Sequence, residues 1–163
     1  MRTRGHDPGH QRRWPVGLSC RHNPRRFGAV DMTIPMPEPD LASAHFFAAL
    51  DQGRLEVLRC GTCDTAHLSV LACDVCGGSD FTGEPASGGG VIYSFTKLHT
   101  AHHPAFADRL PVCGGIVELD EGPRLFAPLF GEESLAIGAR VLVELLPVED
   151  RKIAAFRLVR SAE

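Results

Sequence analysis

The sequence predicts a mainly β protein in which one short N-terminal helix and a small ribbon precede a five-stranded barrel. Three observations favour this class: two matched cysteine pairs, period-two alternation of apolar residues after Gly83, and no helical periodicity between the later apolar segments. The 163 residues suffice for one modest domain with an appendage. The expected division is a disordered leader or mis-assigned start over 1–36, a helix over 37–52, a ribbon over 53–83 and a barrel over 84–163.

The first 31 residues differ in composition from the rest of the chain. They carry seven arginines against Asp7 and Asp31, with scattered proline and glycine and no apolar periodicity. Such a stretch buries too little apolar surface to order itself, so we expect disorder. Two alternatives are an organellar presequence, which is typically rich in arginine, and a true translation start at Met32 or Met36.

A helix is expected over residues 41–50, with Asp40 as its N-cap and Gly53 just past its end. Its apolar residues cover most faces and include the adjacent pair Phe46 and Phe47. One interpretation is that both rings pack on this protein's own ribbon. The other is that one face of the helix binds a partner.

The ribbon is predicted from Cys60-Gly-Thr-Cys63 and Cys73-Asp-Val-Cys76, with nine residues between the pairs. Two such turns that face each other place four thiolates at the corners of a tetrahedron, which is the closed geometry of a structural zinc site. A closed site leaves no position for substrate. The metal is therefore expected to stabilise the fold, with strands over 55–59 and 66–72 delivering the two turns.

Iron in the same tetrathiolate cage is the main alternative to zinc, and a disulfide or redox pair is a third interpretation. Gly77 and Gly78 follow the second pair, where a positive φ lets backbone amides point at sulfur. The remaining cysteines, Cys20 and Cys113, are interpreted as free thiols, with Cys113 in the core of a strand. Thiolates persist in a reducing compartment, so a cytoplasmic location is expected.

The barrel is predicted from five segments rich in β-branched and aromatic residues, joined without a long helix. An OB-like barrel is the natural candidate, and Gly88 to Gly90 suit the sharp coiling that its first strand requires. The expected strands are 91–99, 111–119, 124–130, 140–146 and 152–159.

Several further motifs occur in a fixed order along the chain. They are Phe46-Phe47, Gly53-Arg54-Leu55, the two cysteine pairs followed by Gly77-Gly78, Gly90 to Thr96, Leu110-Pro111, Val117 to Gly122, Ile137-Gly138 and Phe156-Arg157. In this combination, residues 40–160 resemble the family of rubredoxin-like zinc-ribbon plus OB-fold proteins that accompany thiolase-like enzymes and hydratases acting on acyl-CoA. The chain departs from that family in lacking prolines over 68–72 and after Phe156-Arg157.

The resemblance implies a non-catalytic accessory subunit that binds a thiolase-like or hotdog-fold acyl-CoA enzyme and helps to form its acyl-CoA site. The sequence is compatible with this, because it contains no nucleophile elbow, P-loop or dinucleotide fingerprint. No apolar run approaches the roughly 18–20 residues that cross a bilayer. Phe46 and Phe47 are candidates for contact with the partner or ligand.

Charge sets a limit on what the chain binds alone. Residues 32–163 keep 10 of the 17 basic and 18 of the 20 acidic residues, a net charge of −8 before any metal is counted. A body this acidic repels phosphates at long range, so we expect weak binding of acyl-CoA without the partner. Arg109, Arg124 and Arg157 are the candidates for phosphate contacts, although each is equally compatible with an ordinary surface charge.

The alternative function is nucleic-acid binding, because OB barrels and zinc ribbons both serve it. Tyr93, Phe95, Phe126 and Phe130 are the aromatics available for stacking, but the acidic body opposes phosphate binding.

A loop after the first barrel strand holds three imidazoles, His99, His102 and His103. They are interpreted either as a second metal site or general base, or as part of a solvated surface loop.

Overall fold

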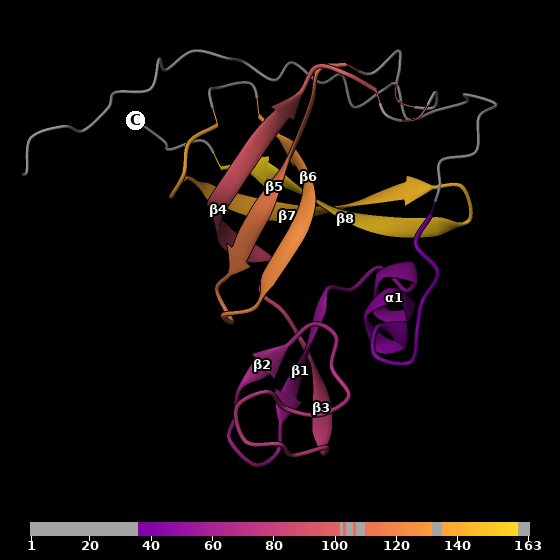
Figure 1. Cartoon of the computed structure of the whole chain (residues 1–163), viewed down its shortest axis with the longest axis vertical. Coiled ribbons are helices and arrows are strands. Elements are labelled where there is room, and N and C mark those ends of the chain that lie inside the picture. Colours follow the sequence, from indigo (N-terminus) through magenta and orange to yellow (C-terminus); the bar gives the residue numbers. More distant parts are fainter. Residues whose placement is uncertain (1–35, 102, 104–105, 107–109, 132–134, 160–163) are drawn as a thin grey trace, which may run out of the picture.

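The computed structural model describes residues 36–101, 103, 106, 110–131 and 135–159. This part of the chain forms one helix, a three-stranded sheet of order β2-β1-β3 and a closed barrel of order β4-β5-β6-β8-β7 (Figure 1). The predicted class, mainly β with a helix, a ribbon and a five-stranded OB-type barrel, is confirmed. The leader proposed over 1–36 lies outside the described residues except for Met36.

Helix α1 spans Ala44–Asp51, so it begins three residues later than predicted. Ser43 is its N-cap residue, whereas Asp40 caps the turn that leads into it. The Asp40 carboxylate accepts the Ser43 N–H at 2.8 Å, and the Ser43 hydroxyl oxygen accepts the Asp40 N–H at 3.0 Å. Gly53 follows the helix with a φ of 85°, as expected for a residue that ends a helix.

The ribbon sheet contains β1 (Glu56–Cys60), β2 (Ala66–His67) and β3 (Phe81–Pro85). The prediction of a strand over 66–72 is wrong beyond His67, because only two residues pair with β1 before the chain turns away to form the second cysteine turn. Strand β3 was not predicted. It is exposed over most of its length and is defined by its pairing with β1.

The barrel contains β4 (Gly89–Leu98), β5 (Val112–Leu119), β6 (Arg124–Phe130), β7 (Arg140–Val148) and β8 (Arg151–Leu158). Their ends lie within two residues of the predicted ends. Neighbouring strands are antiparallel except β6 and β8, which pair in parallel at Leu129 and Phe130.

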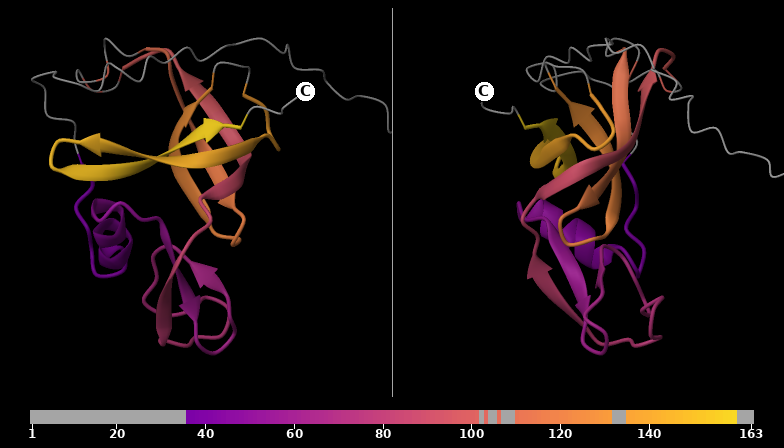
Figure 2. Two further views of the ribbon diagram at one scale, coloured as in Figure 1. Left: turned by 180° about the vertical axis from the view of Figure 1, so that it is seen from behind. Right: turned by 90° about the vertical axis from the view of Figure 1, so that its left-hand side faces the viewer.

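One apolar core joins the helix, the ribbon and the barrel. Leu50 of α1, Val57 of β1 and Phe156 of β8 are at most 2% exposed and belong to the same cluster. Both views in Figure 2 place α1 beside the ribbon, below the β7–β8 hairpin. The Asp51 carboxylate fixes this arrangement by accepting the Lys152 N–H at 3.2 Å and by pairing with Arg151 at 3.3 Å.

Candidate metal centre

The two cysteine turns share one backbone pattern. In the first, Asp64 N–H donates to the Cys60 carbonyl at 2.9 Å, and Cys60 N–H donates to the Thr65 carbonyl at 2.9 Å. In the second, Gly77 N–H donates to the Cys73 carbonyl at 2.8 Å, and Cys73 N–H donates to the Gly78 carbonyl at 2.7 Å. Equal spacing in the sequence therefore folds into equal turns.

The residue after the second cysteine of each turn has a left-handed backbone conformation. Asp64 has a φ of 62° and Gly77 a φ of 74°. Gly78, the next residue in the second turn, lies close to the sulfurs: a Cβ placed there would be 3.4 Å from Cys76 Sγ and 3.5 Å from Cys60 Sγ. The same Cβ would lie 3.0 Å from Thr62 Oγ1, so a larger residue here would require the Thr62 side chain to move.

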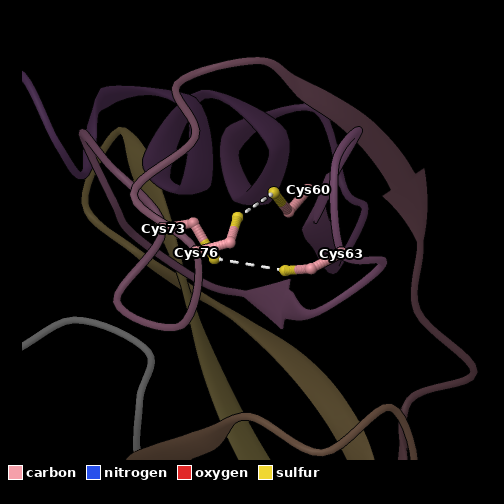
Figure 3. A group of neighbouring side chains, drawn as sticks. All are labelled: Cys60, Cys63, Cys73 and Cys76. Atoms are coloured by element: carbon pink, nitrogen blue, oxygen red, sulfur yellow. Dashed lines mark hydrogen bonds between the residues drawn. The ribbon is translucent and has the colours of Figure 1, made fainter.

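The turns bring the four sulfurs together, as Figure 3 shows. Sγ of Cys60 lies 3.6 Å from Sγ of Cys76, Sγ of Cys63 lies 3.5 Å from Sγ of Cys73, and all four lie within 4.8 Å of one another. Four sulfurs at about 2.3 Å from a tetrahedral zinc ion are separated by about 3.8 Å. The cluster fits a metal ion of this size and can hold one.

The cluster's electrostatics favour thiolate formation in the first turn. The Thr65 hydroxyl, 3.2 Å from Cys63 Sγ, and the Thr65 amide lower the pKa of the Cys63 thiol to about 6. Backbone amides at Thr62 and Cys63 lower the pKa of Cys60. The Gly78 amide lowers the pKa of Cys76, but the adjacent Cys63 sulfur, loss of water and the other two sulfurs outweigh it and raise that pKa to about 12.

The neighbouring sulfurs thus oppose ionisation of Cys76, whereas Thr65 favours ionisation of Cys63. A bound cation removes this conflict, because metal coordination deprotonates a thiol outright. Cys60 and Cys73 are buried, Cys63 is partly buried and Cys76 is exposed. Four protein sulfurs would then fill all four ligand positions of the ion, which is the closed arrangement of a structural site.

The histidine loop is only partly described. His99 is exposed, His103 contacts the Phe106 ring edge-on at 6.3 Å, and His102 lies outside the described residues. Neither His99 nor His103 belongs to a metal-ligand group formed by the described residues. A role for these three histidines stays a prediction.

The candidate arginines that the structure describes are paired with carboxylates. Arg124 lies 2.8 Å from Glu118 and stacks 3.5 Å from the centre of the Tyr93 ring. This pairing holds the pKa of Arg124 above its ordinary value. Arg157 makes two hydrogen bonds to Glu144, at 2.7 and 2.9 Å. Arg109 lies outside the described residues, so phosphate contacts by all three stay predictions.

The same contacts bear on nucleic-acid binding. Base stacking on Tyr93 would have to displace Arg124, and Phe130 is only 8% exposed. Phe126 and Phe95 are exposed, but Arg124 and Arg157 of the barrel are each paired with a carboxylate. The alternative of a basic stacking groove therefore gains no support.

The two helix aromatics have different surroundings. Phe46 is 9% exposed and lies in the shared core, whereas Phe47 packs against that core from its edge and lies 5.1 Å from the Arg151 guanidinium. The rings meet edge-on at 5.4 Å. Phe46 thus packs within the chain's own core, and contact with a partner remains a prediction chiefly for Phe47.

Sequence reasoning missed two residues at the metal centre. His67 and Asp74 lie next to Cys73, and together the three form a second group of ligand atoms within 4.8 Å of one another. Asp74 lies within the second cysteine motif, but no local motif marks His67, which β2 brings close to it only in the fold. Cys113 is buried in β5 as predicted, and Cys20 lies outside the described residues.

The described part of the chain contains no helix that is long and apolar enough to cross a membrane. A cytoplasmic location stays an expectation.

Comparisons with known proteins agree with the fold and the order of its parts. The family model of the ChsH2 C-terminal OB-fold domain matches residues 83–145. A solved structure titled "Ltp2-ChsH2(DUF35) aldolase" aligns with a TM-score of 0.69 and 33% identity, over 76% of this chain and 98% of that chain. A DUF35 protein of unknown function from Sulfolobus solfataricus aligns with a TM-score of 0.53 and 14% identity, over 73% of this chain and 86% of that chain, which supports the fold alone.

A curated relative carries an activity in its name. The chain is 35% identical to a "Probable enoyl-CoA hydratase alpha subunit" of Thermomonospora curvata over 118 residues. The aligned region covers 71% of this chain and 36% of that protein. The chain thus spans about a third of the length of the curated relative that it matches.

Proposed function

The chain belongs to the DUF35 family of ChsH2-type proteins, and on this premise we propose that it is a non-catalytic subunit that binds an acyl-CoA enzyme and helps to form its acyl-CoA site. The observation that carries the proposal is the match over 98% of a DUF35 chain whose structure is titled as an aldolase with Ltp2. The hydratase-named relative supports the same class of substrate, a coenzyme A thioester. Following the family resemblance, the partner is a thiolase-like or hotdog-fold enzyme of lipid metabolism.

The interior of the barrel supports a non-catalytic role. None of the described polar or charged residues is buried, and the barrel's buried side chains are apolar. General acid–base or nucleophilic catalysis needs a titratable group held at a defined position, usually with a shifted pKa. The described barrel core contains no buried carboxylate, imidazole or amine, which is compatible with a partner that supplies the catalytic residues.

The four cysteines are assigned as ligands of one structural zinc ion, with iron as the alternative. The donor set and the sulfur spacing suit both metals, since each accepts tetrahedral thiolate ligands. A zinc-loaded protein is colourless, whereas iron in this cage gives strong visible absorption. When bound, the ion would supply no reaction and would hold the two turns together.

Reconstitution tests the proposed function. The chain is purified with its native partner, the partner is identified, and thioester turnover is measured for the partner alone, for this chain alone and for both together. We expect an acyl-CoA enzyme whose activity requires this chain, and no turnover by this chain alone. Turnover by the isolated chain, or a partner whose activity is the same without it, would overturn the proposal.

A matched pair of variants sharpens this experiment. Arg124→Ala removes a candidate phosphate contact, and Arg59→Ala removes an arginine of the distant ribbon with similar carboxylate pairing. If Arg124 contacts the coenzyme A phosphates, its variant raises the KM of the complex while Arg59→Ala does not. Equal KM values for both variants would remove Arg124 from the site and leave the subunit role intact.

A further inference from the structure

The outer face of strands β4, β5 and β6 carries two exposed aromatic rings. Tyr93 of β4 is 48% exposed, and Phe126 of β6 is 68% exposed. Ile116 of β5 lies between these strands, because it pairs with Ser94 of β4 on one side and with Phe126 on the other. Figure 1 shows the three strands side by side at the front of the barrel. Tyr93, Ile116, Arg124 and Phe126 are together called the aromatic face.

Neighbouring groups position both rings although the rings are exposed. The Arg124 guanidinium lies 3.5 Å from the centre of the Tyr93 ring, and Glu118 holds that guanidinium at 2.8 Å. Phe126 lies over Gly114 of β5, since a Cβ at this glycine would be 3.1 Å from Cζ of the ring. Side chains that are already ordered lose little conformational entropy on binding, so they suit the centre of an interface.

We propose that the aromatic face is the surface through which this chain binds its acyl-CoA enzyme, an inference that rests on the proposed function. Tyrosine and arginine are enriched among the side chains that dominate the binding energy of protein interfaces. The centre of such a surface must carry no unpaired charge, because burying one is costly. Arg124 meets this condition, since its cross-strand neighbour Glu118 pairs with it.

The exposed area suits an interface. An aromatic side chain presents on the order of 200 Å², so the exposed fractions leave roughly 230 Å² of the two rings open to solvent. Ile137 extends this surface, since it is 71% exposed and the adjacent Gly138 donates its N–H to the Ile92 carbonyl of β4 at 2.8 Å. Apolar patches of about 300–600 Å² on a monomer often mark an interaction site, and the aromatic face with Ile137 reaches the lower end of this range.

Charge distinguishes between the partners that could cover this face. Residues 32–163 carry a net charge of −8 before any metal is counted, so a second copy of this chain would bring two strongly acidic bodies together. Coenzyme A carries several negatively charged phosphate groups, and an enzyme that binds it needs basic side chains around its site. The acidic chain and the basic surface of such an enzyme are complementary, which favours the enzyme over a second copy.

The affinities of matched variants test the proposal. The acyl-CoA enzyme that co-purifies with this chain is purified separately, and its Kd for the full chain is measured by isothermal titration calorimetry. Phe126→Ser should raise this Kd at least about thirtyfold, as expected for a side chain at the centre of an interface. Leu41→Ser is the matched control, because Leu41 is 82% exposed, precedes α1 and lies outside the aromatic face. Its Kd should stay within about threefold of the wild-type value.

Hydroxyl-radical footprinting of the wild-type chain keeps the test decisive if Phe126→Ser fails to fold. Binding of the enzyme should lower the oxidation of the Tyr93 and Phe126 rings and leave that of Leu41 unchanged. Rings that are oxidised equally in the free and the bound chain, or a Kd that Phe126→Ser does not change, would place the interface elsewhere. Either result overturns this inference and leaves the proposed subunit role intact.

Two further outcomes are distinguishable. Analytical ultracentrifugation of the wild-type chain alone should show a monomer. A dimer that Phe126→Ser dissociates would assign the aromatic face to a second copy and contradict the inference. If no acyl-CoA enzyme binds the wild-type chain, the proposed function and this inference fail together.

Discussion

Removal of the metal is expected to unfold the ribbon while the barrel stays folded. The ribbon buries few apolar side chains of its own: β2 and β3 have no buried residue, and Leu55, Val57 and Leu58 are the buried aliphatic residues on and next to β1. Each contributes about 1.5–3 kcal/mol. A structural zinc ion contributes on the order of 10 kcal/mol to a small domain of this kind. The ion therefore contributes more to the folding free energy of the ribbon than these three apolar side chains do.

Hydrogen exchange measures this difference by region. In the metal-free protein the amides of Asp64, Cys73 and Gly77, which are hydrogen-bonded within the two turns, should lose at least about a thousandfold of protection, since each 1.4 kcal/mol lost is a factor of ten. Peptides from β5, which lies in the closed barrel, should keep their protection.

Reloading the metal-free protein with Zn²⁺ is the control, and it should restore protection. Protein shown to be free of metal whose turns still exchange as slowly as before would refute the reasoning. The result also tests the division into a ribbon over 53–83 and a barrel over 84–163, which remains a prediction.

Three further predictions concern the barrel. Phe156→Ala should lower the free energy of unfolding by about 3–5 kcal/mol in chemical denaturation, because the ring is 0% exposed at the centre of the core; a loss below about 1 kcal/mol would contradict this packing. Gly115→Ala should destabilise by about 1–3 kcal/mol, since the added Cβ would overlap the Ser94 carbonyl; Gly122→Ala, which has open space but a φ of 106°, is the comparison for backbone strain alone. The Arg140 guanidinium donates hydrogen bonds to both Asp120 carboxylate oxygens and lowers the pKa of that carboxyl. The pair therefore stabilises the folded state at pH values above the unfolded-state pKa of about 3.9. This stabilisation is lost as the pH falls and Asp120 is protonated. The stability difference between the wild type and Asp120→Asn should accordingly shrink below about pH 4 in thermal melts, and a difference that grows in acid would contradict the assignment.

Local patterns in the sequence were sufficient for the barrel and the sulfur cluster. Strand β6 has the predicted bounds, Arg124–Phe130, because a turn precedes it and its residues alternate between the two faces. The cysteine spacing likewise predicts the cluster, since each pair lies on one tight turn and both turns adjoin the Cys60 end of β1.

Features that depend on pairing between distant segments could not be read in this way. Strand β3 is exposed and contains Gly83, so it carries no alternation and exists through its pairing with β1. The stacking of Arg124 on Tyr93 follows a register shift between Ile92 and Ser94 that no local motif marks. His67 and Asp74 meet only because β2 ends after two residues and the chain returns toward Cys73.

X-ray absorption at the metal edge of the protein as purified tests the central claim most directly. The account predicts one zinc ion per chain with four sulfur neighbours at about 2.3 Å. A first shell that contains nitrogen or oxygen in place of any of the four sulfurs, or protein that folds fully with no metal, would contradict it.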